Sequence, residues 1–154
     1  MASSSTQKKD ACTLCEKVGL KPFTKENLFG YYIPLHGLVS YAALSVNVMN
    51  PQIVPKLLPK KDLTNVFLIS TVLGSAVYIY NRPHLKNVDK QKRGAYALVG
   101  ASLFSMGSVL AWALIKSALP QDNSLLATLA GIGTGAAIVK VTTDYIQEVD
   151  KLKN

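Results

Sequence analysis

The sequence predicts an all-α, polytopic membrane protein with four transmembrane helices in two antiparallel hairpins and both termini on the same side. Composition is the first reason: of the 154 residues, 49% are hydrophobic and only 17% are charged, against roughly 25% charged in an ordinary soluble domain. The second reason is that the hydrophobic residues fall into four long runs. The third is that the connections between the runs contain proline and charged residues. This composition excludes disorder for most of the chain.

A helix needs about 20 mostly apolar residues to cross the hydrocarbon core of a bilayer. The four runs that approach this length are residues 29–49, 63–80, 95–115 and 125–141. The predicted organisation is therefore a polar, basic N-terminal tail (1–28), a four-helix transmembrane domain (29–141) and a short amphipathic C-terminal tail (142–154). A soluble bundle would show a polar face on each helix, but residues 95–115 contain no charged residue. So short a chain cannot bury four apolar helices, and lipid is expected to surround them.

The first run, 29–49, contains the polar residues that invite a functional interpretation. Pro34 removes a helix hydrogen bond, so a kink is expected there, with a neighbouring group satisfying the freed carbonyl. His36 lies roughly 10 Å into the helix, and Asn47 lies near its other end. Ionisable groups inside a membrane usually face the bundle interior. His36 and Asn47 are thus a possible intramembrane polar site, for a hydrogen bond between helices, a proton relay or haem ligation.

The later runs carry small residues at four-residue spacing, which allow helix backbones to approach closely where lipid offers no hydrophobic driving force. The predicted helix-packing or partner-interface residues are Ala97, Ala101 and Ser105 in the third run and Ala127, Gly131, Gly133, Gly135 and Ala137 in the fourth. One interpretation is that these strips pack the four helices together. The other is that one strip docks a partner protein, and the fourth run is the best candidate because it has two strips.

Charge and tyrosine placement predict the same orientation. With four spans, 13 of the 17 Lys and Arg residues fall on the side shared by both termini and the connection 81–94. Positive residues collect on the side that is not translocated, so both ends should face the cytosol or the mitochondrial matrix. Tyrosine prefers the headgroup boundary, and six tyrosines fall near the positive boundary: Tyr31, Tyr32, Tyr78, Tyr80, Tyr96 and Tyr145.

The sequence shows no constellation for catalysis. It has no nucleophile elbow, phosphate loop, paired acids or metal cluster, and no acidic residue lies within a run, which argues against ion-coupled transport. Cys12 and Cys15 form a single CxxC pair, whereas a structural zinc site needs four ligands. We therefore expect no enzyme activity, no cofactor, no metal and no nucleic-acid partner.

The expected function is that of a non-catalytic accessory, assembly or scaffolding subunit of a larger membrane complex, with lipid, protein partners or further copies of itself as its contacts. In size and pattern the chain resembles the Gly- and Ala-rich four-span accessory subunits of mitochondrial complexes. No cleavable secretory signal precedes the first run, and the two translocated connections contain no glycosylation sequon. We favour the mitochondrial inner membrane, with the endoplasmic reticulum as the alternative. A small transporter or channel using the first helix, and a haem-binding or enzymatic membrane protein, remain as alternative functions.

Overall fold

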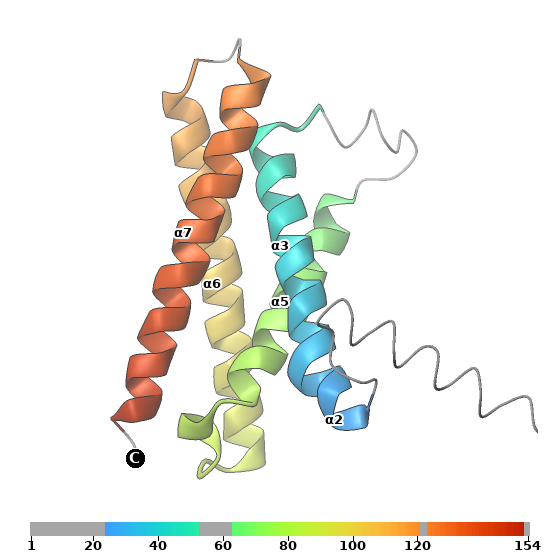
Figure 1. The fold of residues 1–154 in the computed structure, drawn as a ribbon, viewed down its shortest axis with the longest axis vertical. Coiled ribbons are helices and arrows are strands. Elements are labelled where there is room, and N and C mark those ends of the chain that lie inside the picture. Colours follow the sequence, from blue (N-terminus) through green and yellow to red (C-terminus); the bar gives the residue numbers. More distant parts are fainter. Residues whose placement is uncertain (1–23, 53–62, 121–122, 153–154) are drawn as a thin grey trace, which may run out of the picture.

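The computed structural model describes residues 24–52, 63–120 and 123–152, and every element in this part of the chain is a helix. Four helices form a bundle: α3 (Ile33–Met49), α5 (Thr64–Tyr80), α6 (Lys90–Ala118) and α7 (Ser124–Lys151) (Figure 1). The short helix α2 (Lys25–Asn27) and the π-helical turn η1 (Leu28–Tyr32) run directly into α3, and a 3₁₀ turn η2 (Pro83–Leu85) lies between α5 and α6. The predicted all-α class is confirmed.

Successive helices of the bundle run in opposite directions. As a result α2, η2 and the end of α7 lie together at one end of the molecule, which we call the terminal end (Figure 1). The last turn of α3, the start of α5, the end of α6 and the start of α7 lie at the other end, which we call the opposite end. The described chain therefore begins and finishes at the same end, as expected for two hairpins.

Two of the helices extend well beyond their predicted bounds. Helix α6 begins at Lys90 rather than residue 95, and α7 continues without a break from the fourth run through the predicted amphipathic C-terminal segment to Lys151. The added residues include Lys90, Gln91 and Lys92 in α6 and Gln147 and Glu148 in α7, which are good helix formers although they are not apolar. In the described part of the chain, α6 and α7 are long and apolar enough to cross a membrane, and α5 is apolar but has only 17 residues.

The irregular turn of the first helix precedes Pro34. In η1 the Ile33 N–H donates to the Leu28 carbonyl, five residues back. At the same five-residue spacing, the N–H of residue 34 would donate to the Phe29 carbonyl. Residue 34 is proline and has no N–H, so it makes no such bond. The Asn81 side-chain amide at the end of α5 donates to the Phe29 carbonyl at 3.3 Å. The carbonyl that proline leaves free is thus satisfied by the residue that follows α5.

Helices α3 and α6 each contact the other three helices, and α3 makes the more extensive contacts of the two. Its residues Tyr41, Leu44 and Met49 form the buried core together with Trp112 of α6. The Tyr41 ring stacks on Phe104 at 5.1 Å between centroids and lies 4.9 Å from the Trp112 ring. This aromatic cluster joins α3 to α6.

Candidate functional site

The closest approach between helices is the crossing of α3 and α5 at two glycines. A Cβ on Gly37 would lie 2.6 Å from the Gly74 Cα, and a Cβ on Gly74 would lie 2.5 Å from the Gly37 Cα. Real carbon atoms do not approach so closely without repulsion. Any larger residue at either position therefore has to push the two backbones apart, and the crossing depends on both glycines.

Helix α7 packs against α3 and α6 through the strip that contains Gly131 and Gly135. A Cβ on Gly131 would lie 2.8 Å from the Met49 Cγ and 3.1 Å from the Ser45 carbonyl oxygen. A Cβ on Gly135 would lie 3.4 Å from the Trp112 ring. This strip therefore brings the backbone of α7 onto the core cluster, and its other predicted member, Ala127, is partly buried.

The second strip of α7 faces outward. Gly133 and Ala137 are both exposed, and a Cβ on Gly133 would meet no atom within 4 Å in the described structure. By contrast, the predicted packing residues of α6 are inside the bundle: Ala97, Ala101 and Ser105 are 0–2% exposed. Of the residues predicted from four-residue spacing, one set therefore lies inside the bundle and Gly133 and Ala137 lie on its surface.

Polar groups join all four helices at the opposite end. The Asn47 amide donates to Thr64 Oγ1 of α5 at 2.7 Å, and the Asn50 amide donates to Ser124 of α7. Lys116 of α6 donates to the Val48 carbonyl at 3.2 Å. Because Asn47 and Asn50 are only 7% and 8% exposed, these bonds fix the end of α3 against its three neighbours.

The predicted polar pair His36 and Asn47 is not brought together. Asn47 is buried at the opposite end, whereas the His36 side chain is exposed on the outer surface of α3. Their separation of eleven positions corresponds to about 16 Å along the helix. Asn47 therefore has a structural role in joining α3 to α5, and His36 faces away from the interior that the sequence argument expected it to face.

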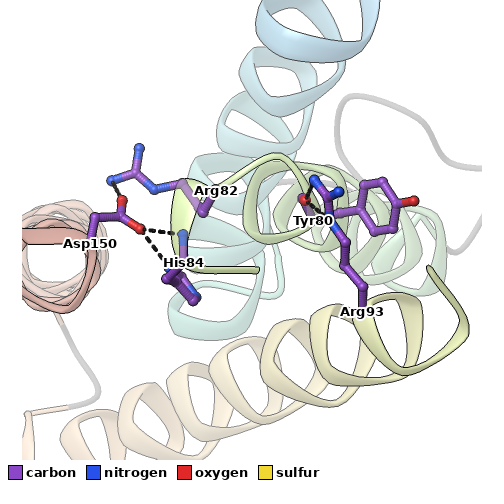
Figure 2. Close-up of polar contacts among 5 residues, drawn as sticks. All are labelled: Tyr80, Arg82, His84, Arg93 and Asp150. Atoms are coloured by element: carbon purple, nitrogen blue, oxygen red, sulfur yellow. Dashed lines mark hydrogen bonds and ion pairs between the residues drawn. The ribbon is translucent and has the colours of Figure 1, made fainter. Parts of the chain in front are cut away.

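At the terminal end, Asp150 near the end of α7 binds two groups of the α5–α6 connection (Figure 2). Its carboxylate lies 2.9 Å from Arg82 Nη2 and 2.5 Å from His84 Nδ1, and it accepts the His84 backbone N–H at 3.2 Å. The Asp150 side chain is 13% exposed. This cluster, which we call the Asp150 cluster, attaches the end of α7 to η2.

The second arginine of this end, Arg93, closes the α5–α6 connection (Figure 2). Its Nε donates to the Tyr80 carbonyl at 2.7 Å, and its guanidinium lies 4.1 Å above the Tyr80 ring. The carbonyl is at the end of α5, where backbone acceptors lack helical partners. Arg93 therefore caps α5 and holds the start of α6 against it.

The Asp150 cluster makes stability depend on pH. Burial raises the pKa of Asp150, but hydrogen bonds from His84 and the charge of Arg82 outweigh it and hold the pKa below its ordinary value of 3.8. A lowered folded-state pKa means that the stabilisation is complete above the unfolded-state value and is lost as the pH falls through the folded-state value. Asp150→Asn should therefore cost about 1 kcal/mol at neutral pH.

The measurement is thermal unfolding of both proteins in one detergent across the acidic range. The difference between Asp150→Asn and the unchanged protein should shrink below about pH 4, because both then carry a neutral side chain at position 150. Glu148→Gln is the matched control on the same helix, since Glu148 is 67% exposed. An Asp150→Asn difference that persists unchanged into acid would contradict the ionic role of the cluster.

The described residues contain no group of three or more His, Cys, Asp or Glu side chains that could hold a metal ion. Cys12 and Cys15 lie outside the described residues. Sequence reasoning missed the Asp150 cluster and the Gly37–Gly74 crossing as units, because no local pattern connects residues so far apart in the chain.

Comparisons with protein-family models, curated proteins and solved structures found no match to this chain. The bundle itself has a closed core, polar groups at both ends and an apolar outer surface.

Proposed function

We propose that all four helices of the bundle cross a membrane, with the terminal end on the side that is not translocated. The observation that carries this proposal is the outward-facing apolar surface. Large hydrophobic side chains between 42% and 72% exposed occur on every helix: Leu38 and Val39 on α3; Val66, Ile69 and Leu73 on α5; Leu98, Val99, Leu103, Met106, Leu110 and Leu114 on α6; Leu125, Leu126, Leu129, Ile132 and Val141 on α7. A soluble bundle of this size would place polar residues at such positions.

The height of this apolar surface matches a bilayer. On α6 the rise from Tyr96 to Lys116 is about 30 Å, and on α7 the rise from Ser124 to Tyr145 is about 32 Å, at 1.5 Å per residue. The hydrocarbon core of a typical bilayer is about 30 Å thick. No Asp, Glu, Lys or Arg occurs in residues 27–52, 63–81, 94–115 or 123–139. The charged residues of the described helices therefore lie at or near the two boundaries.

The tyrosines support the same placement. The Asn81–Phe29 hydrogen bond holds the end of α5 beside η1, and the Arg93–Tyr80 hydrogen bond holds the start of α6 beside the end of α5. These three segments therefore lie at about the same height along the bundle. Tyr96 and Tyr145 are 57% and 68% exposed at the terminal end, where aromatic residues of membrane proteins gather at the headgroup layer. Lys140 lies about 7 Å inside the Tyr145 level, within reach of the boundary for a lysine side chain that extends toward water.

We further propose that the protein acts as a non-catalytic accessory, assembly or scaffolding subunit of a larger membrane complex. The interior supports this function better than transport, because Tyr41, Leu44, Met49 and Trp112 fill the centre of the bundle. The exposed Gly133–Ala137 strip of α7 supplies a surface on which another transmembrane helix can approach closely. On the sequence arguments we favour the mitochondrial inner membrane.

The membrane placement is tested by accessibility labelling of single cysteines in a background without Cys12 and Cys15. Labels at Gln52 and Asn123 should be accessible from one side of the membrane, and labels at Asn87 and Leu152 from the other. Fractionation of the same cells identifies the organelle. Accessibility of Asn87 and Asn123 from the same side would contradict four spans, and a chain that stays in solution without detergent would exclude membrane insertion altogether.

The accessory role is tested at the outward strip. Gly133→Leu should leave the folded bundle intact, because nothing lies within 4 Å of its Cβ position, but should reduce recovery of the chain in a large complex by about tenfold or more. Native electrophoresis after mild detergent extraction measures this recovery. The matched control is Gly107→Leu, the same change at an open glycine on α6. Unchanged complex recovery for Gly133→Leu would exclude this strip as the partner interface.

A further inference from the structure

One face of α6 combines a long apolar stripe with a polar group at one end only. Its residues recur at helical spacing, so that they lie within about 40° of a single line along the helix. The apolar members are Val99, Leu103, Met106, Leu110 and Leu114, which are 57–72% exposed. Toward the terminal end the same line continues with Tyr96, which is 57% exposed, and with the exposed Lys92.

The start of α6 forms an open hollow next to Lys92. Its volume is about 470 Å³, and its lining residues are Asp89, Lys90, Gln91 and Lys92. The Asp89 side chain makes no capping hydrogen bond, so its negative charge is not used to satisfy the helix start. Lys92 lies on the line of the stripe, and Asp89, three residues earlier, lies beside it; Lys90 is two residues from Lys92 and so starts from the other side of the helix.

The two arginines of the terminal end are held by other groups of the protein, so they are not part of this surface. Arg93 is held by the Tyr80 carbonyl and ring, and Arg82 by Asp150 and the Tyr78 ring. Lys90 and Lys92 are exposed cations. A lysine at the headgroup layer attracts anionic phospholipid, and the stripe below it provides the apolar contact that an acyl chain needs.

We infer that this surface of α6 binds an anionic phospholipid, with its phosphate at Lys92 and the Tyr96 hydroxyl and an acyl chain along Val99 to Leu110. The inference depends on the proposed membrane placement. It explains why the polar groups occupy only the terminal end of the stripe: the lipid belongs to the leaflet on that side. Asp89 opposes the binding of an anion, so it limits the affinity of the site.

The experiment uses the full-length protein purified in detergent with mixed phosphatidylcholine and phosphatidylglycerol. Native mass spectrometry then counts the retained lipids. The unchanged protein should retain phosphatidylglycerol in preference to phosphatidylcholine. Lys92→Gln should reduce that preference by about fivefold, the effect expected of one lysine at a membrane surface, and Asp89→Asn should increase it. The matched controls on α2, Lys25→Gln and Glu26→Gln, make the same changes in net charge at the same end and should leave the preference nearly unchanged.

Each alternative outcome has a separate meaning. An equal loss for Lys92→Gln and Lys25→Gln, or no loss for Lys92→Gln, would overturn the site, because general surface charge would then explain the retention. Complete displacement of the lipid by soluble glycerol phosphate would assign the hollow to a soluble phosphate and would also overturn it. Retention of neither lipid by the unchanged protein would instead count against the membrane placement itself.

Discussion

Alanine in place of Gly74 should separate α3 from α5 and lower the free energy of unfolding by about 3 kcal/mol, the upper end of the usual cost of overpacking. The reason is that the added methyl group would lie 2.5 Å from the Gly37 Cα and 3.0 Å from the Ile33 carbonyl oxygen. Both are backbone atoms, so no side-chain rotation relieves the contact. Thermal unfolding of the purified protein in one detergent measures the loss.

The same substitution at an open glycine is the control. Gly107→Ala adds a methyl group with no atom within 4 Å in the described structure, so it should be neutral or stabilise the helix by up to about 1 kcal/mol. Gly37→Ala should resemble Gly74→Ala. The double variant should cost clearly less than the sum of the two, because the first methyl group already separates the backbones. Simple additivity, or equal stability of Gly74→Ala and Gly107→Ala, would show that the crossing does not hold the bundle together.

The sequence predicts the positions of the four long helices well, because long apolar runs between proline-containing or charged connections leave few other structures. It does not predict their ends. Lys90 and Gln91 at the start of α6, and Glu148 and Lys151 at the end of α7, are in helix although hydropathy excludes them from a span. Hydropathy reports where a helix can lie in lipid, whereas helix propensity and end contacts determine where it stops.

The candidate site is harder to predict, because small residues show which surfaces permit close contact but not which surface is used. Gly131 and Gly133 are two residues apart, which places them about 200° apart around α7. Only one of them can then face the bundle, and the complementary shapes of Ser45 and Met49 on α3 determine that it is Gly131. The Asp150 cluster is hard to predict as well, because His84 lies 66 residues from Asp150 in the sequence and only the folded bundle brings the two together.

The aromatic cluster around Trp112 is the second feature on which the bundle depends. Trp112 is 0% exposed, contacts the Tyr41 ring and lies against Gly135 of α7. Trp112→Ala should lower the free energy of unfolding by about 3 kcal/mol, the lower end of the range for large aromatic residues in cores. The lower end applies if the bundle lies in lipid as proposed, because the substitution then removes packing contacts but little transfer free energy from water.

Two further variants separate packing from hydrogen bonding at this position. Trp112→Phe keeps an aromatic ring and should cost less than half as much as Trp112→Ala, because the indole Nε1 has no hydrogen-bond partner among the described residues and its removal breaks no bond. Leu114→Ala, at a side chain 72% exposed on the same helix, should change stability by less than about 0.5 kcal/mol. If Trp112→Phe proved as damaging as Trp112→Ala, the indole N–H rather than the ring volume would join the three helices, and a buried acceptor for it would have to exist.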